Sequence, residues 1–123
     1  MFLKSFTDID AWKEARILVS EIYKITSAGN VRIDFGFKDQ IRRAAVSIMS
    51  NIAEGFDSGS TKSFLVFLGY SYRSASEVLS LLYVALDCGY IDESTFSELE
   101  ERTLSVQKMI GGFIKYLKTR IKK

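Results

Sequence analysis

The chain of 123 residues contains no histidine and no proline, and it has one cysteine, Cys88. Without histidine it lacks the commonest general base and the commonest metal ligand of proteins. The absence of proline favours long helices, because proline interrupts the hydrogen bonding of a helix interior. A single cysteine cannot form a disulfide within the chain, which is typical of proteins from reducing compartments. We therefore expect a helical, cytoplasmic protein in which Cys88 is a small buried side chain.

Long hydrophobic runs and phosphate-binding loops are also missing. The most apolar stretch, residues 78–86, is far shorter than the roughly 18 residues that a membrane-spanning helix needs. The pair Gly111-Gly112 lies in a helical pattern and lacks the Lys-Ser/Thr that follows a phosphate-binding loop. Glu54 and Glu77 have no Glu-x-x-His partner for a metal site. We expect no membrane segment, metal, cofactor, small-molecule substrate or enzymatic activity.

Apolar residues recur at three- and four-residue spacing in four segments, which predicts four helices. The expected helices cover about residues 8–26, 36–54, 61–88 and 93–118. The connections between them are short, so consecutive helices are expected to run antiparallel. Hydrophobic residues make up 47% of the chain and charged residues 26%, which is typical of one folded domain. The sequence predicts an all-α, antiparallel up-down-up-down four-helix bundle as a single domain over residues 1–123.

Residues that favour helix ends lie at the expected boundaries. The candidate N-caps are Thr7 or Asp8, Ser58 or Ser60, and Asp92. We expect Gly55 and Gly89 to end the second and third helices in a left-handed conformation. Gly111-Gly112 should weaken the fourth helix by about 1 kcal/mol per residue relative to alanine. We interpret this pair as a close helix crossing or a bend, with a flexible hinge as the alternative.

The helix expected at residues 36–54 has an apolar arc of about 200°, wider than the roughly 100° that one bundle core requires. The second side of this arc consists of Val46, Met49, Ala53 and Phe56. A monomer would expose this patch, so we predict that it is buried in a homo-oligomer with a heterologous interface. Arg42 projects among these apolar residues and suits the same interface, where arginine is an enriched residue.

Three polar residues of the same helix, Arg43, Asn51 and Glu54, share one face. Because buried charges must be paired, we interpret them as a polar network between helices or subunits, with Glu77 or Gln107 as partners. The alternative is a site for a ligand or an RNA phosphate.

Basic residues cluster at the end of the chain. The cluster consists of Lys115, Lys118, Arg120, Lys122 and Lys123. One interpretation is a solvated helix end whose charges oppose the helix dipole. The other is a nucleic-acid surface, because a ring of subunits would repeat these charges and phosphate binding rises steeply with their number.

A long motif in the second expected helix resembles a known family. It reads Gln40-x-Arg42-Arg43-Ala44-Ala45-x-Ser47-Ile48-x-x-Asn51-Ile52-Ala53-Glu54-Gly55, and Phe6-x-Asp8-Ile9-x-Ala11-Trp12 and Gly89-Tyr90-Ile91 are supporting matches. These motifs resemble the four helix bundle protein family, also called the intervening-sequence protein family because its members are encoded inside insertions in bacterial large-subunit ribosomal RNA genes. The resemblance implies a cyclic homo-oligomer, a pentamer, without established enzymatic activity, and it suggests nucleic-acid binding.

These observations lead to one functional hypothesis and one alternative. The hypothesis is a non-enzymatic oligomeric bundle that binds RNA or other nucleic acid through a symmetric basic surface. The alternative is a structural or scaffolding homo-oligomer that binds another protein.

Overall fold

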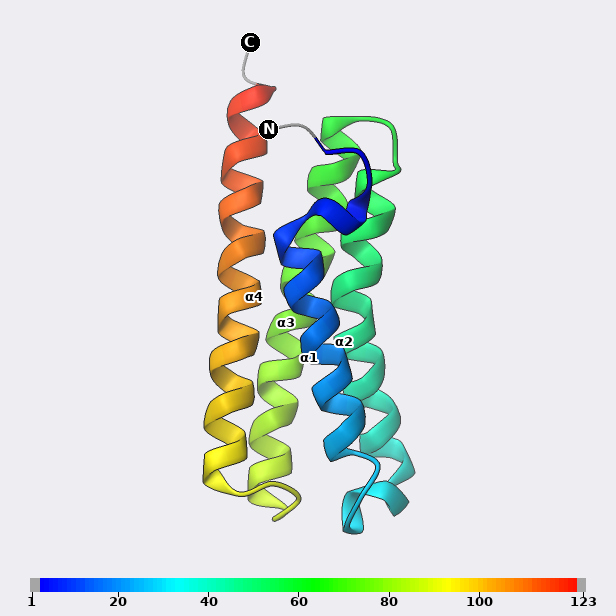
Figure 1. Cartoon of the computed structure of the whole chain (residues 1–123), viewed down its shortest axis with the longest axis vertical. Coiled ribbons are helices and arrows are strands. Elements are labelled where there is room, and N and C mark those ends of the chain that lie inside the picture. The colour runs from blue at the N-terminus through cyan, green and yellow to red at the C-terminus, as the bar shows by residue number, and fades with distance from the viewer. Residues whose placement is uncertain (1–2, 122–123) are drawn as a thin grey trace.

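The computed structural model describes residues 3–121 and consists of helices joined by short turns (Figure 1). The elements are the 3-10 helix η1 (Phe6–Asp8), α1 (Asp10–Ile25), the 3-10 helix η2 (Asn30–Ile33), α2 (Phe35–Phe56), α3 (Thr61–Asp87) and α4 (Glu93–Arg120). Figure 1 shows α1 and α3 running away from the end that holds both termini, and α2 and α4 running back toward it. The predicted all-α helix bundle is confirmed, and none of the helices in residues 3–121 is long and apolar enough to cross a bilayer.

A single apolar core runs along the axis of the bundle. Its largest fully buried side chains include Leu18, Ile22, Ile41, Ile48, Ile52, Leu68, Leu82 and Ile110. Ile41, Ile48 and Ile52 follow the seven- and four-residue spacing that places side chains on one face of a helix. Burying each such side chain contributes about 1.5–3 kcal/mol to folding. The core therefore holds all four helices together and leaves function to the outer faces and the two ends.

Gly55 does not end α2, so that prediction was wrong. The helix continues to Phe56, and Gly55 is buried against α3. An added Cβ atom would lie 2.8 Å from Cδ1 of Phe64 and 2.8 Å from Cβ of Phe67. Gly55 is needed because α3 approaches the backbone of α2 too closely for a larger residue.

The predicted N-caps of α3 and α4 and the glycine predicted to stop α3 are confirmed. The side chain of Ser60 accepts a hydrogen bond from the backbone N–H of Ser63 at 3.1 Å, and that of Asp92 accepts one from Thr95 at 2.8 Å. Gly89 follows α3 with a φ of 73°, the left-handed conformation expected there.

The start of α1 differs from the prediction. Thr7 and Asp8 belong to η1, whose N-cap is Ser5, and α1 begins after Ile9 without a side-chain cap. Asp8 instead accepts hydrogen bonds from the backbone N–H groups of Lys4 and Ser5. A capping box therefore forms one turn earlier than expected, around η1.

Within residues 3–121, the glycine pair of α4 has no close neighbour that would exclude a larger side chain. An added Cβ atom would lie 3.5 Å from Cε2 of Tyr72 at Gly111, which is ordinary contact, and would meet nothing within 4 Å at Gly112. The helix is continuous through both residues. The predicted close helix crossing at this pair was wrong for the single chain.

A hydrogen bond ties the α3–α4 turn to the start of α2. The hydroxyl of Tyr90 donates to Oδ2 of Asp34 at 2.6 Å, while Oδ1 of Asp34 accepts from the backbone N–H of Phe37. The bond to Asp34 raises the pKa of Tyr90 to about 12, and the same bond is the main reason that the pKa of Asp34 is lowered. The bond therefore requires a neutral tyrosine and an ionised aspartate.

We expect Tyr90→Phe to lower the free energy of unfolding by an amount that depends on pH. The raised pKa of Tyr90 means that its contribution is present below pH 10 and is lost as pH rises toward about 12. The lowered pKa of Asp34 means that its contribution is present above pH 3.8 and is lost as pH falls below that value. Urea unfolding of both proteins across pH checks this. A difference that stays constant at both extremes would contradict the assignment.

We expect Gly55→Ala to destabilise the chain and Gly69→Ala to stabilise it. At Gly55 the new methyl group overlaps two phenylalanine side chains, which costs about 1–3 kcal/mol. Gly69 also lies inside a helix, but an added Cβ atom there meets nothing within 4 Å. Gly69→Ala should therefore gain up to about 1 kcal/mol from helix propensity alone. Urea unfolding measures both, and equal stability of the two variants would disprove the close α2–α3 contact.

Candidate functional site

The described part of the basic cluster lies in the last turns of α4, at the end of the bundle where α1 begins (Figure 1). Lys115, Lys118 and Arg120 are all exposed, and Lys122 and Lys123 lie outside the described residues. The guanidinium of Arg120 is 5.5 Å from the centre of the Tyr116 ring, a cation–π distance. This end of the helix therefore presents bases beside a partly exposed aromatic ring.

The fold adds further bases that the sequence did not place there. Leu3 and Thr61 line a hollow of about 230 Å³ together with Arg120, so the first residues and the start of α3 meet the end of α4. Their sequence neighbours Lys4 and Lys62 are both exposed. Because these segments are distant in the sequence, only the tertiary structure reveals this larger basic end.

The apolar patch predicted on α2 is already half-buried in the single chain. Val46, Met49, Ala53 and Phe56 are each intermediate in exposure, and Met49 and Phe56 pack against the core. The helix has a wide apolar arc because it packs against α1 on one side and α3 on the other. The patch therefore does not require a second subunit to cover most of it, and its role as an interface stays a prediction.

Arg42 has a partner within its own chain. Its Nε donates to Oγ1 of Thr26 at 2.8 Å and one Nη donates to Oγ of Ser27 at 3.1 Å, and the guanidinium lies 4.2 Å from the centre of the Tyr23 ring. A cation at this position also opposes the partial negative charge at the C-terminus of α1. This arginine therefore fastens the end of α1 to α2.

The four residues of the predicted polar network do not join one another in the single chain. Arg43 pairs with Asp39 at 2.8 Å, and the side-chain amide of Asn51 donates to the carbonyl and hydroxyl oxygens of Ser47. Glu54 and Glu77 are exposed, and within residues 3–121 neither carboxylate has a hydrogen bond or an ion pair. The outer face of α2 is open to solvent, so its charges need no buried partners.

Several of these side chains instead line a shallow hollow of about 500 Å³ on α2. Arg43, Asn51 and Glu54 contribute to it, together with Arg42 and Tyr23. Gln107, the other suggested partner, donates to the carbonyl of Tyr72 and the hydroxyl of Ser76 on α3. Its amide therefore links α4 to α3 rather than to α2.

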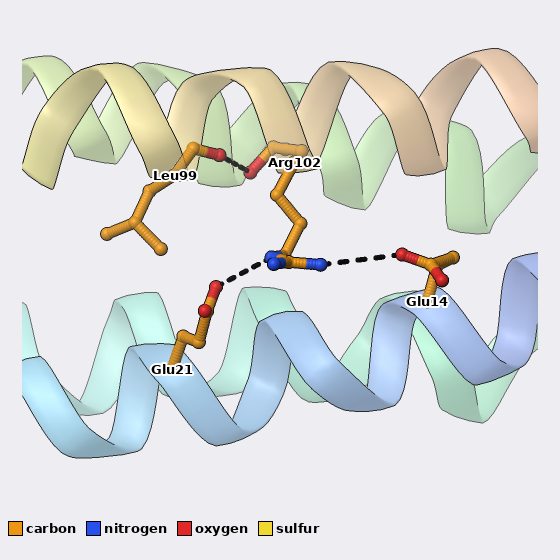
Figure 2. Close-up of polar contacts among 5 residues, drawn as sticks. Glu14, Glu21, Leu99 and Arg102 are labelled. Carbon is orange, nitrogen blue, oxygen red and sulfur yellow. Dashed lines mark hydrogen bonds and ion pairs between the residues drawn. The ribbon is translucent and has the colours of Figure 1, made fainter.

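The strongest charge contact between α1 and α4 was not anticipated. Figure 2 shows Arg102 of α4 between Glu14 and Glu21 of α1. Its Nε lies 2.8 Å from Glu21 and an Nη lies 3.5 Å from Glu14, with all three side chains about one-third exposed. Glu98 and Glu101 also line the hollow around this contact, and no group of three or more candidate metal ligands occurs in residues 3–121. This bridge is structural.

Cys88 is exposed, contrary to the expectation of burial. It is the C-cap of α3, where the chain leaves the helix at the end of the bundle. Residues at such positions no longer face the core. The thiol is accessible, but no histidine in the chain can activate it.

Large apolar side chains are exposed at places other than the predicted patch. Phe35 and Ile33 are 69% and 58% exposed, and Val66 on α3 is 52% exposed. Phe35 follows the N-cap Asp34 directly, outside the spacing of the buried residues of α2. That position was the available signal that Phe35 does not face the core.

Comparison with known proteins agrees with this fold. A solved structure from Bacteroides thetaiotaomicron, described as a protein with unknown function from the S23 ribosomal protein family, superposes with a TM-score of 0.79. It is 21% identical, and the match covers 85% of this chain and 95% of that chain. No curated protein sequence matches the chain. The family model described as 23S rRNA-intervening sequence protein matches residues 7–112. The chain therefore belongs to the 23S rRNA-intervening sequence protein family, as its motifs suggested.

Proposed function

We propose that this protein is a non-enzymatic subunit of a homopentamer that binds RNA or another nucleic acid through the basic end of α4. The observation that carries the proposal is the exposure of Lys115, Lys118 and Arg120 around Tyr116. Exposed Lys4 and Lys62 extend the same end of the bundle. The family description names 23S rRNA but no enzymatic activity, which is compatible with this role.

The arrangement suits the sugar–phosphate backbone better than it suits particular bases. Lysine and arginine neutralise phosphates and release counterions, a term that is independent of nucleotide sequence. In a ring the same end of each subunit would contribute, so the number of phosphate contacts would grow with the number of copies.

Assembly is supported by the apolar side chains that a single chain leaves exposed. Val66 and Tyr70 on α3 are 52% and 46% exposed and lie four residues apart, on one face of the helix. The half-buried patch of α2 adds further apolar surface. We place the assembly in the cytoplasm because the exposed Cys88 would cross-link copies in an oxidising compartment.

A scaffold that binds another protein is the second candidate function. The exposed Val66 and Tyr70 favour it, because apolar side chains on an outer helix face also suit a protein partner. It would need no salt-dependent affinity for nucleic acid, and that difference separates the two candidates.

We expect the replacement of Lys115, Lys118 and Arg120 by alanine to weaken RNA binding and to flatten its dependence on salt. Each lost phosphate contact should reduce the slope of log affinity against log salt by about 0.7 for a single strand. Fluorescence anisotropy with a labelled single-stranded RNA and a labelled duplex, from about 50 to 200 mM salt, measures both quantities. The oligomer should stay assembled, as light scattering can check.

The matched control replaces Lys24, Arg73 and Lys108 by alanine. These are three exposed bases outside the basic end. Both triple variants change the net charge equally, so a general effect of charge would weaken binding equally. An equal loss in both variants would contradict a specific basic end. Wild-type protein that binds no RNA or DNA even at low salt would refute the proposal and favour the scaffold.

A further inference from the structure

A mainly apolar hollow of about 420 Å³ opens between the start of α1 and the second half of α4. We call it the α4 hollow; its walls include Leu3, Ile9, Ala11, Met109, Phe113 and Tyr116, and Gly112 lies among them. Tyr116 is shared with the basic end of α4, where its ring lies beside Arg120. An added Cβ atom at Gly112 would meet nothing within 4 Å. A glycine inside a helix costs about 1 kcal/mol relative to alanine, and no close contact within residues 3–121 explains the choice of glycine here.

The rim of the α4 hollow is acidic. Asp8 and Asp10 line it, and both are exposed. The carboxylate of Asp10 is 85% exposed and lies 3.9 Å from the Lys13 ammonium, which is itself 56% exposed. Such an exposed pair is weak, so Asp10 stays available to another cation. The hollow therefore combines apolar walls with negative charge at its edge.

An apolar projection lies at the opposite end of the bundle. We call residues 30–36, which comprise η2 and the start of α2, the η2 tip (Figure 1). Phe35 is the most exposed large apolar side chain in residues 3–121, and Ile33 is the next most exposed. Added Cβ atoms at Gly29 and Gly36, on either side of this pair, would meet nothing within 4 Å. Within residues 3–121, both side chains therefore keep more than half of their surface open to solvent.

Basic side chains lie in the η2 tip, at Arg32, and directly beside it, at Lys38. Arg32 is exposed, and the ammonium of Lys38 lies 5.2 Å from the centre of the Phe35 ring and 3.0 Å from the carbonyl of Arg32. Asp34 is the acid of the tip, but its two oxygens accept hydrogen bonds from Tyr90 and Phe37. Two cations therefore flank the exposed apolar pair without a free acid between them.

We propose that the η2 tip of one copy docks into the α4 hollow of the next copy. Ile33 and Phe35 lie against the apolar walls beside Gly112, and the cations of the tip face Asp10 at the rim. This inference rests on the self-assembly in the proposed function and names the surfaces that meet. Because tip and hollow are different surfaces, the contact is heterologous and makes a ring when the rotation between copies closes.

A second copy of the chain is the occupant that both surfaces favour. The phosphates of nucleic acid or of an anionic membrane would bind the cations Arg32 and Lys38. The carboxylates of Asp8 and Asp10 at the rim of the hollow would repel the same phosphates. A neighbouring copy instead covers an apolar projection and fills an apolar hollow in one contact. The neighbouring copy would also occupy the open space beside Gly112, because a glycine lets another chain approach a helix closely.

Disulfide cross-linking tests the contact directly. In a Cys88→Ser background, one protein carries Ile33→Cys and another carries Met109→Cys, so that Phe35 and Gly112 are both retained. We expect the mixture to give covalent dimers under mild oxidation, and the doubly substituted chain to give a ladder of larger species. Ile17→Cys mixed with Met109→Cys is the matched control, since Ile17 is also an exposed large apolar residue, at 43%, but lies on α1. It should cross-link much less.

Two further variants separate a loss of contact from a loss of folding. Gly112→Leu places an apolar side chain at the hollow, and its Cβ atom has open space, so circular dichroism should stay helical while light scattering shows smaller species. Arg32→Glu and Asp10→Arg should each weaken assembly, and the chain that carries both should regain it. Failure of this exchange to restore assembly would contradict the paired charges.

The outcomes distinguish this inference from the proposed function. An oligomer that gives no Ile33–Met109 cross-link overturns the tip–hollow contact and leaves assembly through another face. A wild-type monomer at micromolar concentration overturns both this contact and the proposed assembly. If Phe35→Ala weakens RNA binding but leaves the oligomer intact, the η2 tip binds nucleic acid instead, and the contact is again overturned.

Discussion

The close packing of α2 against α3 is the contact on which the rest of the structure depends. Gly55 brings the two backbones together at one end of the pair. Further along, the buried hydroxyl of Ser71 donates to the carbonyl of Ile48 at 2.7 Å, and Ser74 bonds to Ser47 at 2.9 Å. Small residues therefore line this seam, and their hydroxyls are satisfied across it, which a close helix approach requires. With α2 and α3 in register, α1 and α4 complete the core.

This central position of α2 changes the meaning of its most conspicuous sequence feature. A helix that packs on two neighbours buries a wider arc than a helix that packs on one, so a broad apolar arc does not require another subunit. Arg42, which the sequence predicts for a subunit interface, holds the end of α1 within its own chain, and its role in an interface stays a prediction. Besides the half-buried patch of α2 and the exposed Val66 and Tyr70 of α3, three surfaces are open to other molecules: the basic end of α4, the η2 tip and the α4 hollow. All three are formed wholly or partly at element ends, where side chains no longer face the core.

Features that depend on residues close together in the sequence could be predicted, whereas features that depend on contacts between distant segments could not. The helices, the caps Ser60 and Asp92 and the left-handed Gly89 depend on neighbours within a few residues, and the sequence predicted them. Gly55 was misread because glycine serves equally as a helix end and as a site of close approach. The partners of Arg43 and Asn51 were misread because a shared helix face does not say whether that face is covered.

The amino-acid sequence by itself determined the helical class, the number of long helices and the family, because periodicity, end signals and motifs are local. Only the tertiary structure decided which polar residues are paired and which apolar residues stay exposed. It joined Lys4 and Lys62 to the end of α4, and it set Phe35 and Gly112 on separate surfaces of the bundle. The physical reason is that burial depends on what lies across from a side chain, and that neighbour comes from a distant part of the chain.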